Sequence, residues 1–142
     1  MFTCEKIYED IAFAHVQYKH DGRCRFVHGH NWAFTFVFAC ESLDEQGFVV
    51  DFGGLKFIAK WLDENLDHAC VFAKADKTAH AMIEAFPQLF KPYFVECASA
   101  EGLAQHLHAI FDPQVRAMTN NRAWIKAVKT CESSRDIATY DV

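Results

Sequence analysis

The segment His28-Gly29-His30-Asn31-Trp32-Ala33-Phe34-Thr35-Phe36-Val37-Phe38-Ala39-Cys40 decides the fold class of this chain. From Asn31 to Cys40, large aromatic residues occupy every second position, and small or β-branched residues fill most of the positions between them. A period of two is typical of a β-strand, whose successive side chains point to opposite faces of a sheet. Because both sets of positions are largely apolar, we expect both faces of this strand to be at least partly buried.

Periodic segments on both sides of this strand predict the rest of the fold. We expect further strands at Thr3–Phe13, Phe48–Val50, Ala123–Thr130 and Ile137–Tyr140. We expect helices from Leu55, over Asp76–Phe86 and after Ser99, the last ending near Pro113; Asp51 caps the first of them and Pro87 stops the second. The order predicts an α+β fold, with its helices on one face of an antiparallel sheet.

Length and composition exclude several classes of protein. The 142 residues are enough for a single domain over 1–142, and 51% hydrophobic with 23% charged residues argues against disorder. A net charge of −5 disfavours a nucleic-acid binder. No run of about 18 apolar residues could cross a membrane, and no basic-then-apolar leader opens the chain. The six cysteines form no C-x-x-C pair, so we expect free thiols and a cytoplasmic protein.

Two of the eight histidines, His28 and His30, provide the first chemical signal. In an extended segment, residues two apart share a face, so the pair offers half of a metal site. With eight histidines in the chain, such a pair is also common by chance. A second pair, His106 and His108, lies on a predicted helix, where residues two apart do not face each other. We expect these two side chains to face solvent.

His15 ends the first predicted strand. It could join the pair if the first strand lies beside the second, and it could equally be an ordinary core or surface histidine. Three imidazoles without a thiolate suit a catalytic zinc, which keeps a fourth position open for water or substrate.

Cys24 lies four residues before His28, in a loop that also carries Lys19, Arg23 and Arg25. Cationic neighbours favour the reactive thiolate form of a cysteine. The residues alone leave three interpretations open: a reactive thiolate, a zinc ligand or a buried thiol.

Several acidic and polar residues are further candidates for chemistry, and each also has a purely structural interpretation. Asp67 precedes His68, and a carboxylate beside a histidine can orient it and hold its charge; alternatively, the histidine only satisfies a helix end. Glu132 follows the last long strand, and Ser99 is most simply a helix cap.

Taken in order, these fragments resemble the 6-pyruvoyl-tetrahydropterin synthase family, and within it the bacterial 6-carboxy-tetrahydropterin synthases of queuosine biosynthesis. The resemblance is carried by Phe13-x-His15, Cys24-x-x-x-His28-Gly29-His30, Gly47-x-Val49-x-Asp51-Phe52-x-x-Leu55-Lys56, Leu66-Asp67-His68, Ser99-x-Glu101-x-Leu103-Ala104 and Glu132-Ser133, with Tyr140 near the end. The spacing of three residues between Cys24 and His28 resembles that of the carboxy-forming enzymes.

The resemblance implies the tunnelling fold, a four-stranded antiparallel sheet with helices on one face. In this fold the sheets of several subunits join into a barrel, usually a hexamer of two stacked trimers. It also implies the conversion of 7,8-dihydroneopterin triphosphate to 6-carboxy-5,6,7,8-tetrahydropterin, acetaldehyde and triphosphate. The implied roles are zinc ligands for His15, His28 and His30, catalytic base for Cys24, proton relay for Asp67 and His68, pterin anchor for Glu132, and substrate binding for Ser99.

Three alternatives remain open at this point: a pyruvoyl-forming synthase on the same substrate, a non-catalytic zinc- or pterin-binding protein, and a redox sensor using its thiols. Two features depart from the family pattern. The segment from Ala69 to Ala98 is longer than in compact bacterial members, and Ala98 stands where proline is usual. This segment could cover the pocket or pad an oligomer.

Overall fold

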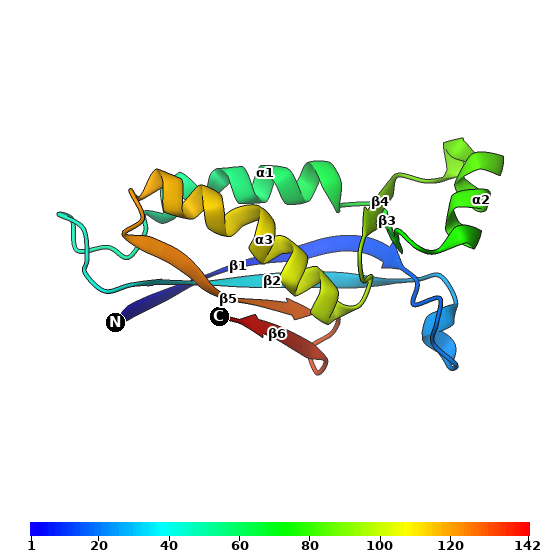
Figure 1. Cartoon of the computed structure of the whole chain (residues 1–142), viewed down its shortest axis with the longest axis horizontal. Helices are drawn as coiled ribbons and strands as arrows, with labels where there is room; N and C mark the ends of the chain where they lie inside the picture. Colours follow the sequence, from blue (N-terminus) through cyan, green and yellow to red (C-terminus); the bar gives the residue numbers. More distant parts are fainter.

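A computed structural model describes all 142 residues as one mixed sheet with three α-helices (Figure 1). The strands are β1 (Phe2–His15), β2 (His28–Cys40), β3 (Cys70–Ala73), β4 (Pro92–Val95), β5 (Ala123–Cys131) and β6 (Ile137–Asp141). The helices are α1 (Lys56–Asn65), α2 (Lys77–Ala85) and α3 (Ala100–Met118), with short 3₁₀ turns η1 (Arg23–Arg25), η2 (Phe52–Leu55) and η3 (Pro87–Leu89). The six strands lie in the order β4-β3-β1-β2-β5-β6.

The centre of the sheet is the antiparallel pair of β1 and β2. The register runs from Phe2 opposite Cys40 to His15 opposite His28, with an irregularity between Tyr8 and Ile11. β5 pairs with the other edge of β2, and β6 pairs with β5, both antiparallel. The predicted α+β class and these four strands are therefore confirmed. β2 begins three residues earlier than Asn31, so the two histidines that precede it belong to the strand.

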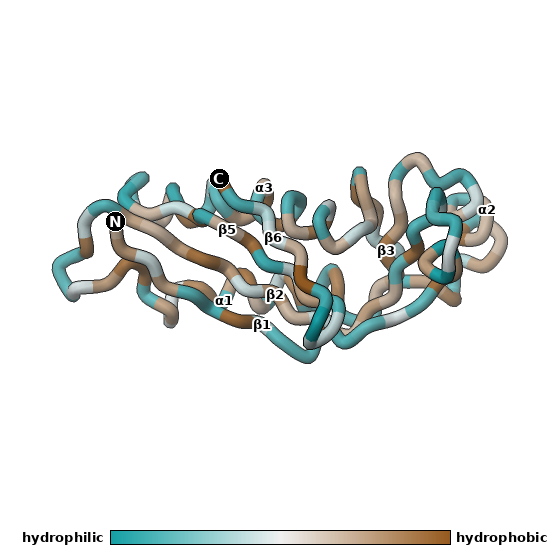
Figure 2. The backbone as a smooth tube through the Cα atoms, turned by 90° about the horizontal axis from the view of Figure 1, so that it is seen from below, coloured by the Kyte–Doolittle hydropathy of each residue, from teal (hydrophilic) through white to brown (hydrophobic).

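The core lies between the sheet and helices α1 and α3, which cover one face (Figure 1). The aromatic side chains of β2 that point to this face, Trp32, Phe34, Phe36 and Phe38, are fully buried. No helix crosses the opposite face of the four antiparallel strands (Figure 2). Thr35, Val37 and Ala39, which alternate with the aromatics, are buried there by neighbouring strands.

The expected four-stranded antiparallel sheet is wrong, because β3 and β4 extend it to six. They pair in parallel with each other, and β3 pairs in parallel with β1 at Ala14 and His15. Both strands lie in the long segment from Ala69 to Ala98, and strands of four residues are too short to carry a readable period.

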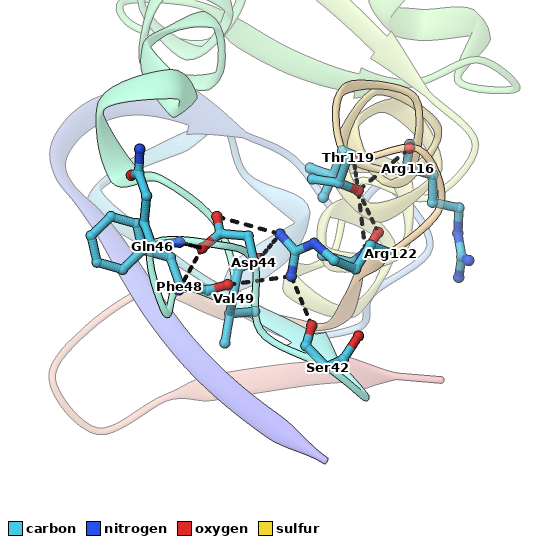
Figure 3. A network of polar contacts seen from close by, with 10 residues as sticks. Ser42, Asp44, Gln46, Phe48, Val49, Arg116, Thr119 and Arg122 are labelled. Atoms are coloured by element: carbon cyan, nitrogen blue, oxygen red, sulfur yellow. Dashed lines mark hydrogen bonds and ion pairs between the residues drawn. The ribbon is translucent and has the colours of Figure 1, made fainter.

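The expected strand at Phe48–Val50 is also absent, since these residues form a bend. Val49 and Val50 are buried, which explains their apolar character. The guanidinium of Arg122 donates hydrogen bonds to the carbonyls of Phe48 and Val49, at 3.2 and 2.8 Å (Figure 3). These carbonyls therefore accept hydrogen bonds from a side chain and not from the backbone of a neighbouring strand.

The predicted caps are confirmed only in part, and the helices differ in placement. Asp76 and Ser99 each accept a backbone N–H in the first turn of α2 and α3, whereas Asp51 caps η2, the 3₁₀ turn before α1, and α1 has no side-chain cap. However, α2 packs on the opposite face of β3 from α1 and α3: Val71 joins the main core, whereas Cys70 and Phe72 pack with Ala79 of α2. The helices are therefore not all on one face.

Helix α3 runs past its expected end near Pro113 to Met118. Its buried stripe continues from Phe111 to Val115, so packing on the sheet outweighs the loss of one helical hydrogen bond at the proline.

The expectation that His106 and His108 face solvent is wrong, since both are half-buried. Nε2 of His106 lies 2.6 Å from the hydroxyl of Tyr93, and Nε2 of His108 lies 2.8 Å from the carbonyl of Ile125. They flank the buried Leu107, so α3 packs deeply enough to engage both. None of the three helices has the length and apolar character needed to cross a bilayer.

Candidate metal centre

The pairing of β1 with β2 brings three histidines together. His15, the last residue of β1, lies directly opposite His28, the first residue of β2, and His30 lies opposite Phe13. Residues opposite each other or two apart share one face of a sheet. The ligand nitrogens of His15, His28 and His30 accordingly lie within 4.8 Å of one another and form a group that could hold a metal ion.

Backbone carbonyls fix the tautomers of two of these rings. Nδ1 of His15 lies 2.7 Å from the carbonyl of Ala98, and Nδ1 of His28 lies 2.7 Å from the carbonyl of Phe26. A carbonyl only accepts, so each Nδ1 donates its N–H and, in the neutral ring, leaves a lone pair on Nε2. Metal-binding histidines are commonly oriented in this way.

The lone pairs of the first two rings point at each other, because their Nε2 atoms are only 3.0 Å apart. Burial lowers the pKa of His15 to about 4, and the nearby rings of His28 and His30 add to this effect, so His15 is neutral near pH 7. Two neutral acceptor nitrogens at this distance repel each other, and a cation between them would replace that repulsion with attraction.

The third ring supplies a further unsatisfied nitrogen. Nε2 of His30 is buried and has no hydrogen-bond partner. Buried polar atoms almost always have partners, and an unsatisfied one costs about 1–3 kcal/mol. Three converging imidazole nitrogens without a thiolate are a donor set that fits zinc with one position open.

Glu132 lies beside this group, one residue after β5. Its Oε1 is 3.8 Å from Nε2 of His15, and its side chain is 22% exposed. It lines a hollow of about 400 Å³ together with Gln17, Glu101 and Arg135. The carboxylate is thus open to a bound molecule on one side and faces the histidines on the other.

Asp67 and His68 form an oriented pair after α1. Nδ1 of His68 donates to Oδ2 of Asp67 at 2.8 Å, and the side chain of His68 is 82% exposed. The backbone N–H of His68 donates to the carbonyl of Ala12 at 2.7 Å, which holds the residue at a positive φ of 60°. His68 and His30 line the same hollow of about 480 Å³.

Cys24 and Ser99 lie at the same end of the sheet. Cys24 is half-buried in η1, and its carbonyl accepts the N–H of Gln17 at 2.9 Å, which closes the loop after His15. Ser99 caps α3 through Gly102, and with Gln17 it lines a pocket of about 360 Å³. Of the residues proposed from the sequence, the structure brings the three histidines together with Glu132 beside them, and His68 shares a hollow with His30. Cys24 and Ser99 lie in the segments next to this end of β1 and β2 and line neither that hollow nor the one at Glu132.

Sequence reasoning missed the carbonyls of Ala98 and Phe26, because a backbone acceptor carries no side-chain signal. A glycine near the start of α3 is the one clue to the first of them. A Cβ on Gly102 would clash with the carbonyl of Cys97 and lie 2.6 Å from its Cβ. The close approach fixes the segment that brings Ala98 to His15.

Comparison with protein families gives one match over nearly the whole chain. The family model described as 6-pyruvoyl tetrahydropterin synthase matches residues 5–142. A 6-carboxy-5,6,7,8-tetrahydropterin synthase of Rickettsia bellii (strain RML369-C) is 35% identical over 107 residues, 71% of this chain and 78% of that protein. The protein of the same name from Rickettsia conorii (strain ATCC VR-613 / Malish 7) is 32% identical over 121 residues, 84% of this chain and 87% of that protein.

Solved structures share the fold. An uncharacterized protein from Wolinella succinogenes superposes with a TM-score of 0.87 at 16% identity, over 99% of this chain and 97% of that one. The 6-pyruvoyl tetrahydropterin synthase of Plasmodium vivax gives a TM-score of 0.69 at 13% identity, over 100% of both chains. At these identities the likeness concerns the fold alone.

Proposed function

Because the chain belongs to the 6-pyruvoyl tetrahydropterin synthase family, we propose that it converts 7,8-dihydroneopterin triphosphate to 6-carboxy-5,6,7,8-tetrahydropterin, acetaldehyde and triphosphate. The reaction would serve queuosine (7-deazaguanine) biosynthesis. The observation that carries the proposal is the convergence of three imidazole nitrogens, one of them buried and unpartnered, beside Glu132. The names of the two Rickettsia relatives support the carboxy-forming outcome over the pyruvoyl-forming one.

His15, His28 and His30 would hold the metal through their Nε2 atoms. When bound, zinc would act as a Lewis acid that acidifies hydroxyl groups of the substrate side chain. The carbonyls of Ala98 and Phe26 would keep two of the rings in the ligating tautomer.

Four further groups would handle protons and bind the substrate. Cys24, as a thiolate, would remove a carbon-bound proton from the substrate. His68 would return a proton, because Asp67 occupies its Nδ1 and leaves Nε2 free for transfer. Glu132 would anchor the pterin, since a carboxylate can accept two parallel N–H bonds from a guanidine-like ring edge. Ser99 would contribute its hydroxyl at the rim.

We propose that the active form is a homo-oligomer, a barrel of two stacked trimers. The sheet face opposite α1 and α3 has no helix across it (Figure 2), and the exposed side chains of Ile7 and Ile137 lie on this face. The outer edge of β6 is unpaired, and β3 pairs with β1 only at Ala14 and His15. Both edges of the antiparallel sheet can therefore pair with strands of neighbouring subunits. An active protein with a monomer mass at micromolar concentration would contradict this.

The test of function is a turnover assay on zinc-loaded protein with 7,8-dihydroneopterin triphosphate, in which triphosphate and acetaldehyde are measured together. We expect both products in equal amounts. Triphosphate without acetaldehyde would indicate the pyruvoyl-forming reaction. Binding of substrate without either product would indicate a zinc- or pterin-binding module, and turnover that follows added oxidant would indicate a redox sensor.

The metal site has its own test in the His28→Ala variant. We expect the folded variant to lose most of its zinc, measured by elemental analysis after dialysis, because two imidazoles bind zinc far more weakly than three. Full zinc occupancy in the folded variant would exclude His28 as a ligand.

A further inference from the structure

We infer that Trp32 is a positioning residue of the metal centre, whose indole holds the rings of His15 and His30 in their ligating orientation. The inference rests on the zinc site proposed above. It concerns a residue that touches neither metal nor substrate and acts only through the ligands.

The indole contacts two of the three ligand rings at once. The ring centroids of Trp32 and His15 are 4.9 Å apart with an angle of 88° between the planes. The centroids of Trp32 and His30 are 5.1 Å apart at 89°. Edge-to-face contacts of this kind are favourable and specific in geometry.

The indole itself has one fixed orientation. Its Nε1–H donates to the carbonyl of Phe13 at 3.0 Å, and the ring of Phe13 stacks on it with centroids 4.4 Å apart and planes 6° apart. Trp32 is fully buried. A hydrogen bond, a stacked ring and complete burial together leave the indole no alternative rotamer, so it can serve as a rigid wall.

The three ligands differ in what else orients them. His15 and His28 each donate Nδ1–H to a backbone carbonyl. Neither ring nitrogen of His30 makes a hydrogen bond, and Nε2 is buried without a partner. The orientation of His30 therefore depends on the rings around it, those of His15, His28 and Trp32, and Trp32 is the one of the three that is not itself a ligand. The indole takes the role that a carbonyl plays for the other two.

The expected change in Zn²⁺ affinity follows from the usual contribution of groups that orient metal ligands. Loss of such a partner lowers metal affinity by about 10–100-fold. We expect the Trp32→Phe variant to bind Zn²⁺ 10- to 100-fold more weakly, because the smaller ring loses the bond to Phe13 and part of the contact with His30. We also expect the visible bands of the Co²⁺-loaded variant to shift or broaden, because the ligand geometry is less defined.

The experiment measures Zn²⁺ affinity by competition with a chromophoric chelator, and Co²⁺ spectra, on apo protein from wild type and variants. Trp61→Phe is the matched control: Trp61 is partly buried against the core, where it contacts the rings of Tyr93 and Phe111 and none of the three histidines. We expect this control to keep wild-type affinity even if it unfolds at a lower temperature. Should Trp32→Phe fail to fold, Phe13→Leu removes only the stacked ring, keeps the carbonyl, and is expected to weaken Zn²⁺ several-fold.

Each outcome is decisive. Wild-type affinity and an unchanged Co²⁺ spectrum in folded Trp32→Phe, or in Phe13→Leu if that variant is needed, would overturn the inference. Equal weakening in Trp61→Phe would also overturn it, since the effect would then be general loosening of the core. The proposed zinc site itself fails if wild type binds no Zn²⁺, or if its Zn²⁺ binding is unchanged in His28→Ala. That result is distinct from the failure of the positioning role.

Discussion

We expect the His30→Leu variant to be at least as stable as wild type without metal, and less stable than wild type when zinc is bound. Nε2 of His30 is buried without a hydrogen-bond partner. An unsatisfied buried polar atom costs about 1–3 kcal/mol, and leucine has a similar volume and no polar atom. The leucine loses the ring contact with Trp32, worth about 1 kcal/mol. In a chelating buffer we therefore expect His30→Leu to equal wild type or exceed its free energy of unfolding by about 1–2 kcal/mol.

With zinc the order should invert. A ligand that binds only the folded state at 1,000 times its Kd adds about 4 kcal/mol to the free energy of unfolding. Wild type would gain this amount, whereas the variant keeps only two of the three imidazoles and would gain much less. The net difference of about 2–3 kcal/mol in favour of wild type corresponds to roughly 10 °C in Tm for a chain of this length.

The assay is denaturant and thermal unfolding of both proteins in EDTA and in excess zinc. His108→Leu is the matched control, because Nε2 of His108 already has a partner, the carbonyl of Ile125 at 2.8 Å. We expect this control to lose about 1 kcal/mol in both buffers and to keep the full zinc effect. A loss of more than about 1 kcal/mol by His30→Leu in EDTA, or stabilisation of this variant by zinc as large as that of wild type, would contradict the expected inversion.

Three other predictions concern the base, the pH dependence and the far end of the sheet. Cys24→Ala should retain zinc and lose turnover by about a hundredfold or more, measured on one sample, with Cys4→Ala as the control; loss of zinc would instead make Cys24 a ligand. Burial lowers the pKa of His15 from 6.5 to about 4, so the unfolded chain binds a proton that the folded chain refuses. The free energy of unfolding of metal-free protein should therefore fall as pH drops from 6.5 to 4, by on the order of 3 kcal/mol from this residue, and His15→Gln should remove that part of the slope in denaturant titrations. Arg122→Ala should lower the free energy of unfolding by about 2–3 kcal/mol, since the guanidinium donates hydrogen bonds to three loop carbonyls (Figure 3). It should leave zinc affinity unchanged, because Arg122 lies at the opposite end of β2 from the histidines. A change in zinc affinity would contradict this and show coupling along the strand.

Local pattern sufficed for the long elements. The alternation from Asn31 to Cys40 identified β2, and the apolar stripe after Ser99 identified α3, because each spans enough residues to display its period. The end of α3 did not follow from Pro113, since the buried residues beyond it outweigh one missing hydrogen bond. Strands β3 and β4 could not be predicted, because four residues paired in parallel with distant partners leave no local signature.

Residue type and spacing identify the candidates for chemistry: the pair His28 and His30, His15 at a strand end, and their order among the family-like fragments. That these side chains meet depends on the strand register that places His15 opposite His28, which no local pattern specifies. The tertiary structure also sets the tautomers, through the carbonyls of Ala98 and Phe26, and leaves Nε2 of His30 buried without a partner. The physical reason is that residue type fixes which groups can bind, whereas burial and backbone neighbours fix which lone pairs remain free to do so.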